Sequence, residues 1–471
     1  MDELEAVSKI RIFLRQEGFI VPRKPVQEFY SSIVKLSGFG IGGILNVSGK
    51  KAGKIAGQIL KELIGNHAPS TEEIELYLRT FLEEAGIGVV DHWENEENRV
   101  KIYIKGSVFA EGQEGKKDIL RDAEMGFCEA YMRGDVIVEG DLERVLMACM
   151  EYLASNERKS LKDTFSYLFR FLLKGLRLIK GLEGKEVRRH YDLGNDFYRL
   201  WLDSSMTYSC AFFSEPSVSL EEAQSEKRRI IYEKLQLKEG DRLLDIGCGW
   251  GSIILESASL YNIRSVGITL SKNQYEFVKD KIEELGLKGR VEVYLMHYED
   301  LPKLGEKFNK VVSVGMFEHV GKGRHRKFFE VVNQIMEEGG LFLLHTIGKV
   351  HPSSQSRWIR KYIFPGGYLP SIEEVIKASK DLDFNLIDID DWRLHYYFTL
   401  KEWKKRFYKV KDWVIKRYGE EFFRMWELYL TASAVSFYIG SNHLFQFLFS
   451  KGVVNSYPVM RRQFGYPLLA T

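Results

Sequence analysis

A glycine-rich turn directly after an apolar run is the feature that most narrows what this chain can fold into. Residues 243–251 read LLDIGCGWG, so Asp245 stands near the end of the run and Gly247, Gly249 and Gly251 follow at every second position. Glycine lets a backbone leave a strand sharply and approach a ligand closely, and the next residues can begin a helix. The segment predicts a strand–turn–helix unit with a ligand at the turn, although such turns also occur for packing reasons alone.

The spacing of these glycines indicates which ligand fits. The fingerprint for dinucleotide pyrophosphates, G-x-G-x-x-G, needs its third glycine where this chain has Ser252. The shorter spacing suits S-adenosylmethionine, which has no phosphate group but carries an aminoacyl tail. We therefore expect an enzyme that binds this cofactor through Asp245, Gly247 and Gly249.

Composition sets the broad class of the protein. The chain has 471 residues, more than one ordinary domain, and its 45% hydrophobic and 28% charged residues are typical of a globular protein. A formal charge of +2 does not favour nucleic acid as a partner. Four widely spaced cysteines predict neither a disulfide framework nor a metal site and fit a cytoplasmic location. Because the N-terminus is acidic and no apolar run reaches about 18 residues, we expect only peripheral contact with a membrane.

The alternation of apolar segments predicts an α/β fold. The strands we expect lie at residues 242–246, 265–268, 291–296, 310–314 and 341–345, with helices such as 272–285 and 325–336 between them. This order is typical of a doubly wound, Rossmann-like class I methyltransferase sheet. We place this domain at residues 191–471, with an aromatic, helical C-terminal cap beyond residue 350. Residues 1–155 mix helical and strand patterns, for example at 71–85 and 100–104, and predict a smaller α+β domain.

A basic segment at residues 156–190 links the two predicted domains. Between residues 158 and 189 it has ten basic and three acidic residues, with apolar residues three and four positions apart. Such an amphipathic basic helix is typical of a surface that docks on anionic lipid. An ordinary linker helix packed on its own protein explains the same pattern.

Six motifs carry a resemblance to a known family. They are residues 190–198 (HYDLGNDFY), 208–211 (YSCA), 244–251 (LDIGCGWG), 314–321 (VGMFEHVG), 344–348 (LHTIG) and 361–365 (KYIFP). In this order they closely resemble the cyclopropane-fatty-acyl-phospholipid synthases and, more distantly, the mycolic acid cyclopropane synthases. The resemblance covers about residues 190–455, and residues 125–134 look like the end of that family's N-terminal domain.

The resemblance implies a reaction on lipid. A methyl group from S-adenosylmethionine is added to the cis double bond of an unsaturated phospholipid acyl chain, and loss of a proton closes a cyclopropane ring. An alkene is a weak nucleophile, so we expect a dry, apolar slot that aligns it with the methyl donor. A positioned base must then remove the proton. The resemblance also implies a homodimer that associates peripherally with an anionic membrane surface.

By the same resemblance the base is a bicarbonate ion, held by Cys210, Glu318, His345, Ile347 and Tyr396. Glu318 and His345 each follow an apolar run, at the edge where doubly wound sheets bind ligands. Other interpretations stay open for each residue. Cys210 is explained equally by a small buried side chain, and His345 by a cap on a strand end. Tyr396 is explained by core packing, with Tyr397 as a rival for its role. Glu318 is also a candidate proton acceptor without bicarbonate.

Further cofactor contacts follow from the resemblance on three loops. They are Tyr208 and Ser209, then Thr269, Leu270 and Gln274, and then Tyr298 and Glu299. Helix capping is a strong alternative for Thr269 and Gln274. A family cysteine in the C-terminal helical part is absent here, and we assign no catalytic role to Ser433, which stands nearby. An aromatic group near the C-terminus lines an acyl tunnel or belongs to the core: Phe437, Tyr438, Phe445, Phe447 and Phe449.

Two other functions share most of these motifs. One is a lipid C-methyltransferase that leaves a methyl branch or a methylene group in place of the ring. The other is a lipid-binding protein that keeps the fold without catalysis. The presence of Glu318, His345 and Tyr396 argues against the second alternative.

Overall fold

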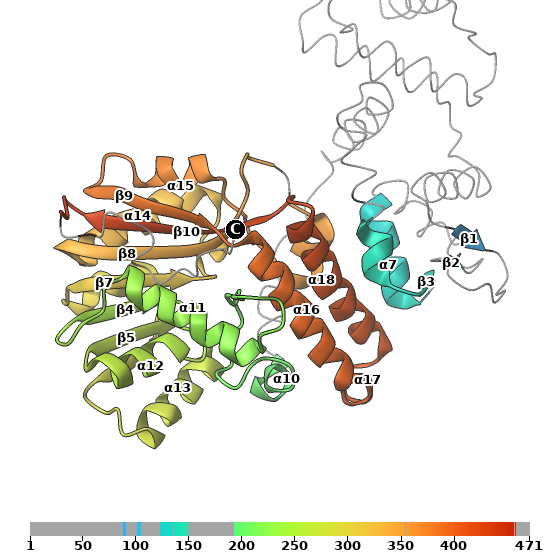
Figure 1. Ribbon diagram of the computed structural model, residues 1–471, viewed down its shortest axis with the longest axis horizontal. Coiled ribbons are helices and arrows are strands. Elements are labelled where there is room, and N and C mark those ends of the chain that lie inside the picture. Colours follow the sequence, from blue (N-terminus) through green and yellow to red (C-terminus); the bar gives the residue numbers. More distant parts are fainter. Residues whose placement is uncertain are drawn as a thin grey trace, which may run out of the picture. The chain divides into compact units, whose positions relative to one another are not determined.

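The computed structural model describes residues 88–90, 101–104, 123–134, 136–147, 150, 193–353, 355–455 and 457 (Figure 1). The chain divides into two compact units, residues 1–130 with 135–183 and residues 131–134 with 184–471. The predicted helix at 71–85 and the basic link at 156–190 lie outside the described residues. These two elements, and the domain boundaries at 155 and 190, stay predictions.

The smaller unit contains a short mixed sheet. Strand β1 (Gly88–Val90) pairs in parallel with β2 (Lys101–Ile104), and β2 pairs in antiparallel fashion with β3 (Val136–Glu139). Helix α7 (Ala123–Arg133) precedes β3 in the chain. The strand expected at 100–104 is thereby confirmed to within one residue.

The larger unit is built on a seven-stranded sheet in the order β6-β5-β4-β7-β8-β10-β9 (Figure 1). Its strands are β4 (Arg242–Ile246), β5 (Arg264–Thr269), β6 (Val291–Leu295), β7 (Phe308–Val314), β8 (Met336–Gly348), β9 (Phe384–Asp391) and β10 (His443–Lys451). The five strands from β4 to β8 confirm the five predicted ones. They run parallel, as apolar strands buried on both faces should.

The region beyond residue 350 is not only the helical cap that we expected. Strands β9 and β10 add to the sheet, and β10 is antiparallel to both of its neighbours, so the sheet is mixed. Strand β8 also continues to Gly348, three residues past its predicted end at 345. His345 therefore lies inside a strand and not after it.

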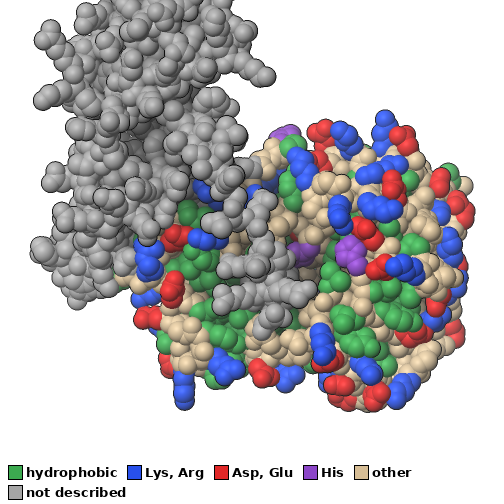
Figure 2. Space-filling model, turned by 180° about the vertical axis from the view of Figure 1, so that it is seen from behind, with side chains coloured by type: hydrophobic (Ala, Val, Ile, Leu, Met, Phe, Trp, Pro, Cys, Tyr) green, Lys and Arg blue, Asp and Glu red, His purple; other side chains and the backbone are tan. Residues whose placement is uncertain are grey.

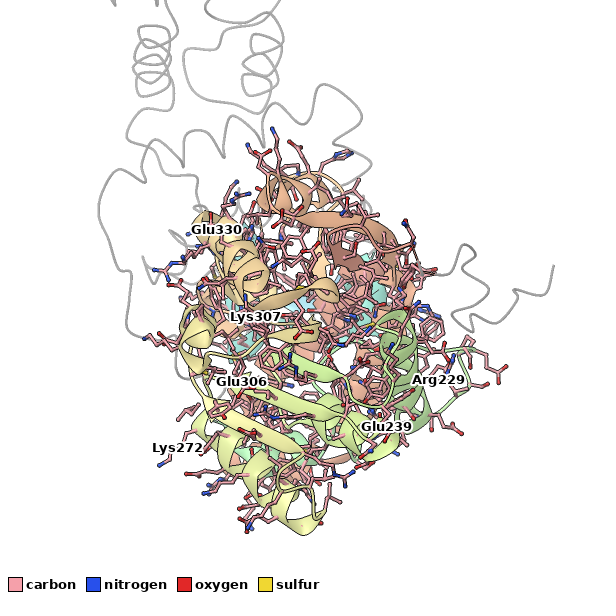
Figure 3. All side chains as sticks on the ribbon, turned by 90° about the vertical axis from the view of Figure 1, so that its left-hand side faces the viewer. Arg229, Glu239, Lys272, Glu306, Lys307 and Glu330 are labelled. Carbon is pink, nitrogen blue, oxygen red and sulfur yellow. The ribbon has the colours of Figure 1, made fainter. Side chains whose placement is uncertain are left out.

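Helices cover both faces of this sheet. The described helices of this unit are α10 (Asn195–Arg199), α11 (Leu220–Lys234), α12 (Ser252–Tyr261), α13 (Lys272–Glu284), α14 (His325–Ile335), α15 (Ile372–Ser379), α16 (Arg393–Lys409), α17 (Lys411–Tyr418) and α18 (Glu420–Tyr438). Along β8, Leu341 and Leu343 pack with α11 and α12, whereas Phe342 and Leu344 pack with α14 and α15. In Figure 3, Arg229 of α11 and Glu330 of α14 lie on opposite sides of the sheet.

The parallel strands end near α16 and α18, which pack against each other (Figure 1). Figure 3 looks onto the opposite edge, where Glu239 precedes β4 and Glu306 and Lys307 precede β7. Three fully buried tryptophans, Trp201, Trp403 and Trp426, join the loop after α10 to α16 and α18. The carboxyl-end edge of the sheet is thus covered by aromatic side chains.

The described surface in Figure 2 carries acidic and basic side chains close together. Among the described residues, no helix has the length and apolar character needed to pass through a bilayer.

Candidate active site

The glycine turn after β4 has two crowded positions, Gly247 and Gly251, and one open position, Gly249. Gly247 has a φ of 91°, and a Cβ placed there would lie 2.6 Å from Cβ of Met316, so this position requires glycine. A Cβ at Gly249 would meet no atom within 4 Å. The turn therefore leaves open space at Gly249, as the predicted close approach of a cofactor requires.

Asp245 lies in β4 immediately before this turn and is buried. Its Oδ1 atom has no hydrogen-bond partner among the described residues. Burial raises the pKa of Asp245 to about 7, against the opposing effect of the Lys227 charge. A buried carboxyl oxygen without a partner is costly, and it suits a ligand that brings its own donor.

The segment containing Tyr208 and Ser209 is held from two sides. Lys227 of α11 is buried and donates a hydrogen bond from Nζ to Ser209 Oγ at 2.8 Å. Burial, with the nearby Arg228 charge, lowers the pKa of Lys227 to about 7. The hydroxyl groups of Tyr208 and Tyr429 are 2.8 Å apart, which connects the segment to α18.

The predicted contacts after β5 have local partners in the structure. Thr269 donates from Oγ1 to Gln274 Oε1 at 2.7 Å, and Ser271 caps α13 by accepting from the Gln274 N–H. Ser271 is the helix cap, whereas the bond between Thr269 and Gln274 joins two side chains and is not a capping bond. Leu270 is 70% exposed, an apolar side chain open to a ligand at the end of β5.

The predicted contacts after β6 lie at the start of a 3-10 helix, η3 (Tyr298–Leu304). Tyr298 is buried in the core cluster beside Phe328 and donates from its hydroxyl to Glu299 Oε1 at 3.2 Å. Glu299 also accepts from Arg324 at 2.9 Å. Tyr298 thus has a packing role, and the carboxylate beside it is already paired with a cation.

Glu318 lies in a 3-10 turn, η4 (Phe317–His319), just after β7. Its Oε1 accepts a hydrogen bond from the Ile347 N–H at 2.6 Å, whereas its buried Oε2 has no partner among the described residues. Burial raises the pKa of Glu318 to about 7. The carboxyl group is therefore fixed by one oxygen and free to bind a ligand with the other.

His345 is fully buried in β8, two residues before Ile347. Burial lowers the pKa of His345 well below its ordinary value, so the ring is neutral. Its Nδ1 is 3.1 Å from Nε2 of Gln446 in β10, and its Nε2 has no partner among the described residues. The side chain is thus held by another side chain, and not by backbone as a strand-end cap would be.

Tyr396 lies in α16, and the segment that contains Cys210 is hydrogen-bonded to the same helix. Burial raises the pKa of the Cys210 thiol, so the group is protonated. The next residue, Ala211, donates its N–H to Thr399 of α16 at 2.9 Å. Tyr396, one turn earlier in α16, is buried and packs on Phe437 with ring centroids 4.5 Å apart.

Trp392, at the start of α16, connects these parts of the site. Its ring lies 5.6 Å from that of His345 and 4.9 Å from that of Phe212. The structure joins Glu318 to Ile347 by a hydrogen bond and places His345 two residues before Ile347 in β8. Trp392 contacts the rings of both His345 and Phe212, so α16 links β8 to the segment that follows Cys210. Sequence reasoning missed Gln446, Lys227 and Lys234. The available signal for Gln446 was one polar residue inside the apolar run HLFQFLF at 443–449.

The sheet order and the glycine turn define a class I S-adenosylmethionine-dependent methyltransferase fold with a mixed seven-stranded sheet. Within this class, the chain belongs to the mycolic acid cyclopropane synthetase family, whose model matches residues 180–447.

Individual relatives agree with this family. The chain is 36% identical over 384 residues to the cyclopropane-fatty-acyl-phospholipid synthase of Escherichia coli K12, which covers 79% of this chain and 97% of the relative. The structure of the cyclopropane synthase MmaA2 from Mycobacterium tuberculosis superimposes with a TM-score of 0.54 at 36% identity, over 56% of this chain and 97% of that one. The mycolic acid cyclopropane synthase CmaA1, complexed with SAH and CTAB, gives 0.53 at 34% identity, over 57% and 99%.

Proposed function

We propose that this chain is a cyclopropane-fatty-acyl-phospholipid synthase that uses a bicarbonate ion as its base. It is an S-adenosylmethionine-dependent enzyme that transfers a methylene unit to unsaturated acyl chains. The observation that carries the proposal is a pair of buried atoms without partners among the described residues, Glu318 Oε2 in the turn after β7 and His345 Nε2 in the neighbouring strand β8. The phospholipid as acceptor is inferred from the Escherichia coli relative.

The residues around the glycine turn fit S-adenosylmethionine. Asp245 Oδ1 is a buried acceptor without a partner, and the cationic amino group of the aminoacyl tail is the kind of donor it lacks. Gly249 leaves room for the ligand, and Leu270 offers an exposed apolar side chain at the end of β5. When bound, the cofactor supplies an activated methyl group on a sulfonium. Tyr208, Ser209, Gln274 and Glu299 remain predicted contacts.

The residues at the ends of β7 and β8 fit a small oxyanion. A bicarbonate ion supplies an oxygen that accepts a proton. His345 is neutral and able to donate a hydrogen bond. The protonated Cys210 thiol donates to the Ala211 carbonyl at 3.1 Å, so its contact with the ion stays a prediction. Glu318 Oε2 is able to accept the bicarbonate hydroxyl. The Ile347 N–H is donated to Glu318, so its contact with the ion, like that of Tyr396, stays a prediction.

The chemistry needs this combination of groups. A new carbon–carbon bond forms as the alkene donates its π electrons to the methyl group, and the carbon–sulfur bond breaks with its electrons kept by sulfur. The acyl chain is then cationic, and aromatic faces stabilise cations. Removal of a proton from the added methyl group leaves the electrons that close the ring. Burial of the site excludes the water that would otherwise capture the cation.

Membrane association and dimerisation belong to the same proposal. The basic link at 156–190 supplies the charge that would bind an anionic surface, although it lies outside the described residues. The homodimer follows from the family resemblance.

One assay tests the proposal as a whole. The protein is incubated with S-adenosylmethionine carrying a ¹³C-methyl group and unsaturated phospholipid vesicles, and the products are examined by NMR. Cyclopropane signals are expected, whereas a methyl branch or a methylene group would identify the lipid C-methyltransferase alternative. Formation of S-adenosylhomocysteine excludes a non-catalytic lipid-binding protein.

The role of bicarbonate is tested in the same assay after exhaustive removal of CO₂. Turnover should fall and recover when bicarbonate is restored. Unchanged turnover would leave Glu318 as the proton acceptor instead.

A further inference from the structure

Three polar residues form a row across the last three strands of the sheet. In the pairing of β8 with β10, His345 stands opposite Gln446, and in the pairing of β10 with β9, Gln446 stands opposite Asp390. Directly opposed residues place their side chains on the same face, so His345, Gln446 and Asp390 follow one another in a line. The neighbours of Gln446 in β10, Phe445 and Phe447, point into the apolar core on the other face.

Lys234, the last residue of α11, reaches this row and is completely buried. Its Nζ donates to Gln446 Oε1 at 2.9 Å and to Asp390, and it lies 3.5 Å from an Asp388 oxygen. The two carboxylates balance its charge inside the protein, where an unpaired ammonium would be costly. Lys234 is therefore held in place by groups other than Gln446.

This arrangement determines which way the Gln446 amide faces. An ammonium group only donates hydrogen bonds, so the amide oxygen must face Lys234. The amide nitrogen then faces His345, whose Nδ1 is 3.1 Å away. The amide nitrogen carries only hydrogens, so Nδ1 of His345 must accept. A neutral imidazole has one hydrogen, which is thereby placed on Nε2.

We propose that Lys234 and Gln446 are positioning residues that fix His345 as the Nε2–H tautomer and so present a hydrogen-bond donor to the oxyanion beside Glu318. The other tautomer would turn a lone pair toward the anion and repel it. The inference rests on the proposed function for its catalytic meaning, because an oxyanion must bind there. The tautomer itself is a property of the protein alone.

The tautomer is measured directly by ¹⁵N NMR of the full chain labelled at histidine, without cofactor or lipid. The two ring nitrogens have different chemical shifts when they carry a hydrogen and when they do not. The chain has ten histidines, and the His345 signals are assigned by their loss in His345→Gln. We expect Nε2 to be protonated and Nδ1 to be bare. A hydrogen on Nδ1 in the unmodified protein would overturn the inference without any variant.

Gln446→Glu tests the cause of this preference. At alkaline pH the new carboxylate accepts from Lys234 and also from His345, so the hydrogen should move to Nδ1. We expect kcat to fall roughly 10- to 100-fold, the loss typical when a residue that orients a metal-ligating histidine is changed, with little change in KM for S-adenosylmethionine. Gln334→Glu makes the same change at an exposed position on α14 and is the matched control. It should leave both the His345 tautomer and kcat unaltered.

The outcomes separate this inference from the proposed function. An unmoved hydrogen in Gln446→Glu, or a moved hydrogen with normal kcat, would overturn the positioning role. A protonated Nε2 that moves as expected, with the loss of kcat, supports it. If turnover is independent of bicarbonate while the tautomer behaves as expected, the proposal that the base is bicarbonate is wrong. The inference that Lys234 and Gln446 position His345 is then unaffected.

Discussion

Two side-chain atoms, Glu318 Oε2 and His345 Nε2, are buried without partners among the described residues. Each such atom costs the folded protein about 1–3 kcal/mol, because its hydrogen bonds to water are lost and not replaced. Asp245 Oδ1 is in the same situation at the glycine turn. At the scale of single residues, these three atoms lower the stability of the folded protein until a ligand or water binds them.

Glu318→Gln should abolish ring formation and leave cofactor binding nearly intact. The amide oxygen still accepts from the Ile347 N–H, so the local structure is kept, but the side chain no longer accepts a proton or a bicarbonate hydroxyl. We expect a loss of about 10²- to 10⁴-fold in turnover, the usual contribution of a group that takes part in proton transfer. Product formation and calorimetric titration with S-adenosylhomocysteine measure the two effects. Weak cofactor binding would instead make Glu318 a structural residue.

The same carboxyl group predicts how stability depends on pH. Its pKa is about 7 in the folded protein against an ordinary value of 4.5, so between these values the native state binds more protons than the unfolded state. The free energy of unfolding should therefore fall as pH rises from about 4.5 to about 7. Asp245, with a pKa of about 7, acts in the same direction from its ordinary value of 3.8.

Urea unfolding of the cofactor-free protein across this pH range measures the effect. Glu318→Gln should flatten the decline, whereas Glu330→Gln, a change at an exposed position, serves as the control (Figure 3). An equal slope in the Glu318 variant would show that the buried carboxyl group titrates normally.

At the scale of elements, strand β10 shows which of its aromatic residues belong to the core and not to an acyl tunnel. Phe445, Phe447 and Phe449 belong to the cluster that α14 and α15 cover, which is the core interpretation. Phe447→Ala should lower the free energy of unfolding by about 3–5 kcal/mol, the usual cost of deleting a buried phenylalanine. Tyr438→Ala, which truncates a side chain that is 46% exposed, should cost far less. A change in acyl-chain preference without loss of stability in Phe447→Ala would restore the tunnel interpretation.

Sequence patterns predicted the elements that carry their own local signal. Strands β4 to β7 are short apolar runs between helical periods, and their predicted ends agree with the structure to within two residues. Strand β9 contains Asn385, Asp388 and Asp390, and β10 follows a long helix in an aromatic region, so neither showed the expected pattern. Their strand character comes from pairing with β8, which is a tertiary effect.

Like the strands, the candidate site residues were predictable from the sequence only where they carry a local signal. Asp245 lies inside the apolar strand β4 and Glu318 follows β7, positions where a carboxylate calls for an explanation, and both are buried with one oxygen lacking a partner among the described residues. Gln446 and Lys234 are 212 residues apart and meet His345 only through strand register and the end of α11. No pattern of residue spacing in the sequence predicts these contacts.

At the scale of the whole molecule, the proposed function requires the enzyme to bring the acyl chain of a membrane phospholipid to a buried site. The basic link at 156–190 is the segment whose charge suits an anionic surface, so neutralising Lys174, Arg177 and Lys180 should weaken binding to anionic vesicles. Each lysine or arginine near such a surface contributes about 1 kcal/mol, so three together should cost about 3 kcal/mol at low salt. The loss should shrink as salt is added, because added ions already screen the wild-type attraction.

The matched control removes the same charge from the methyltransferase-like unit. Lys272, Lys288 and Lys303 have side chains that are 76%, 73% and 76% exposed, and their replacement by glutamine changes the net charge equally. If attraction depends only on total charge, the two triple variants should bind vesicles equally weakly in co-sedimentation. If the link is the docking element, only its own variant should lose binding, and turnover on vesicles should fall with it while S-adenosylmethionine binding is unchanged. Vesicle binding that survives in the link variant would reduce the segment to a connector between two domains.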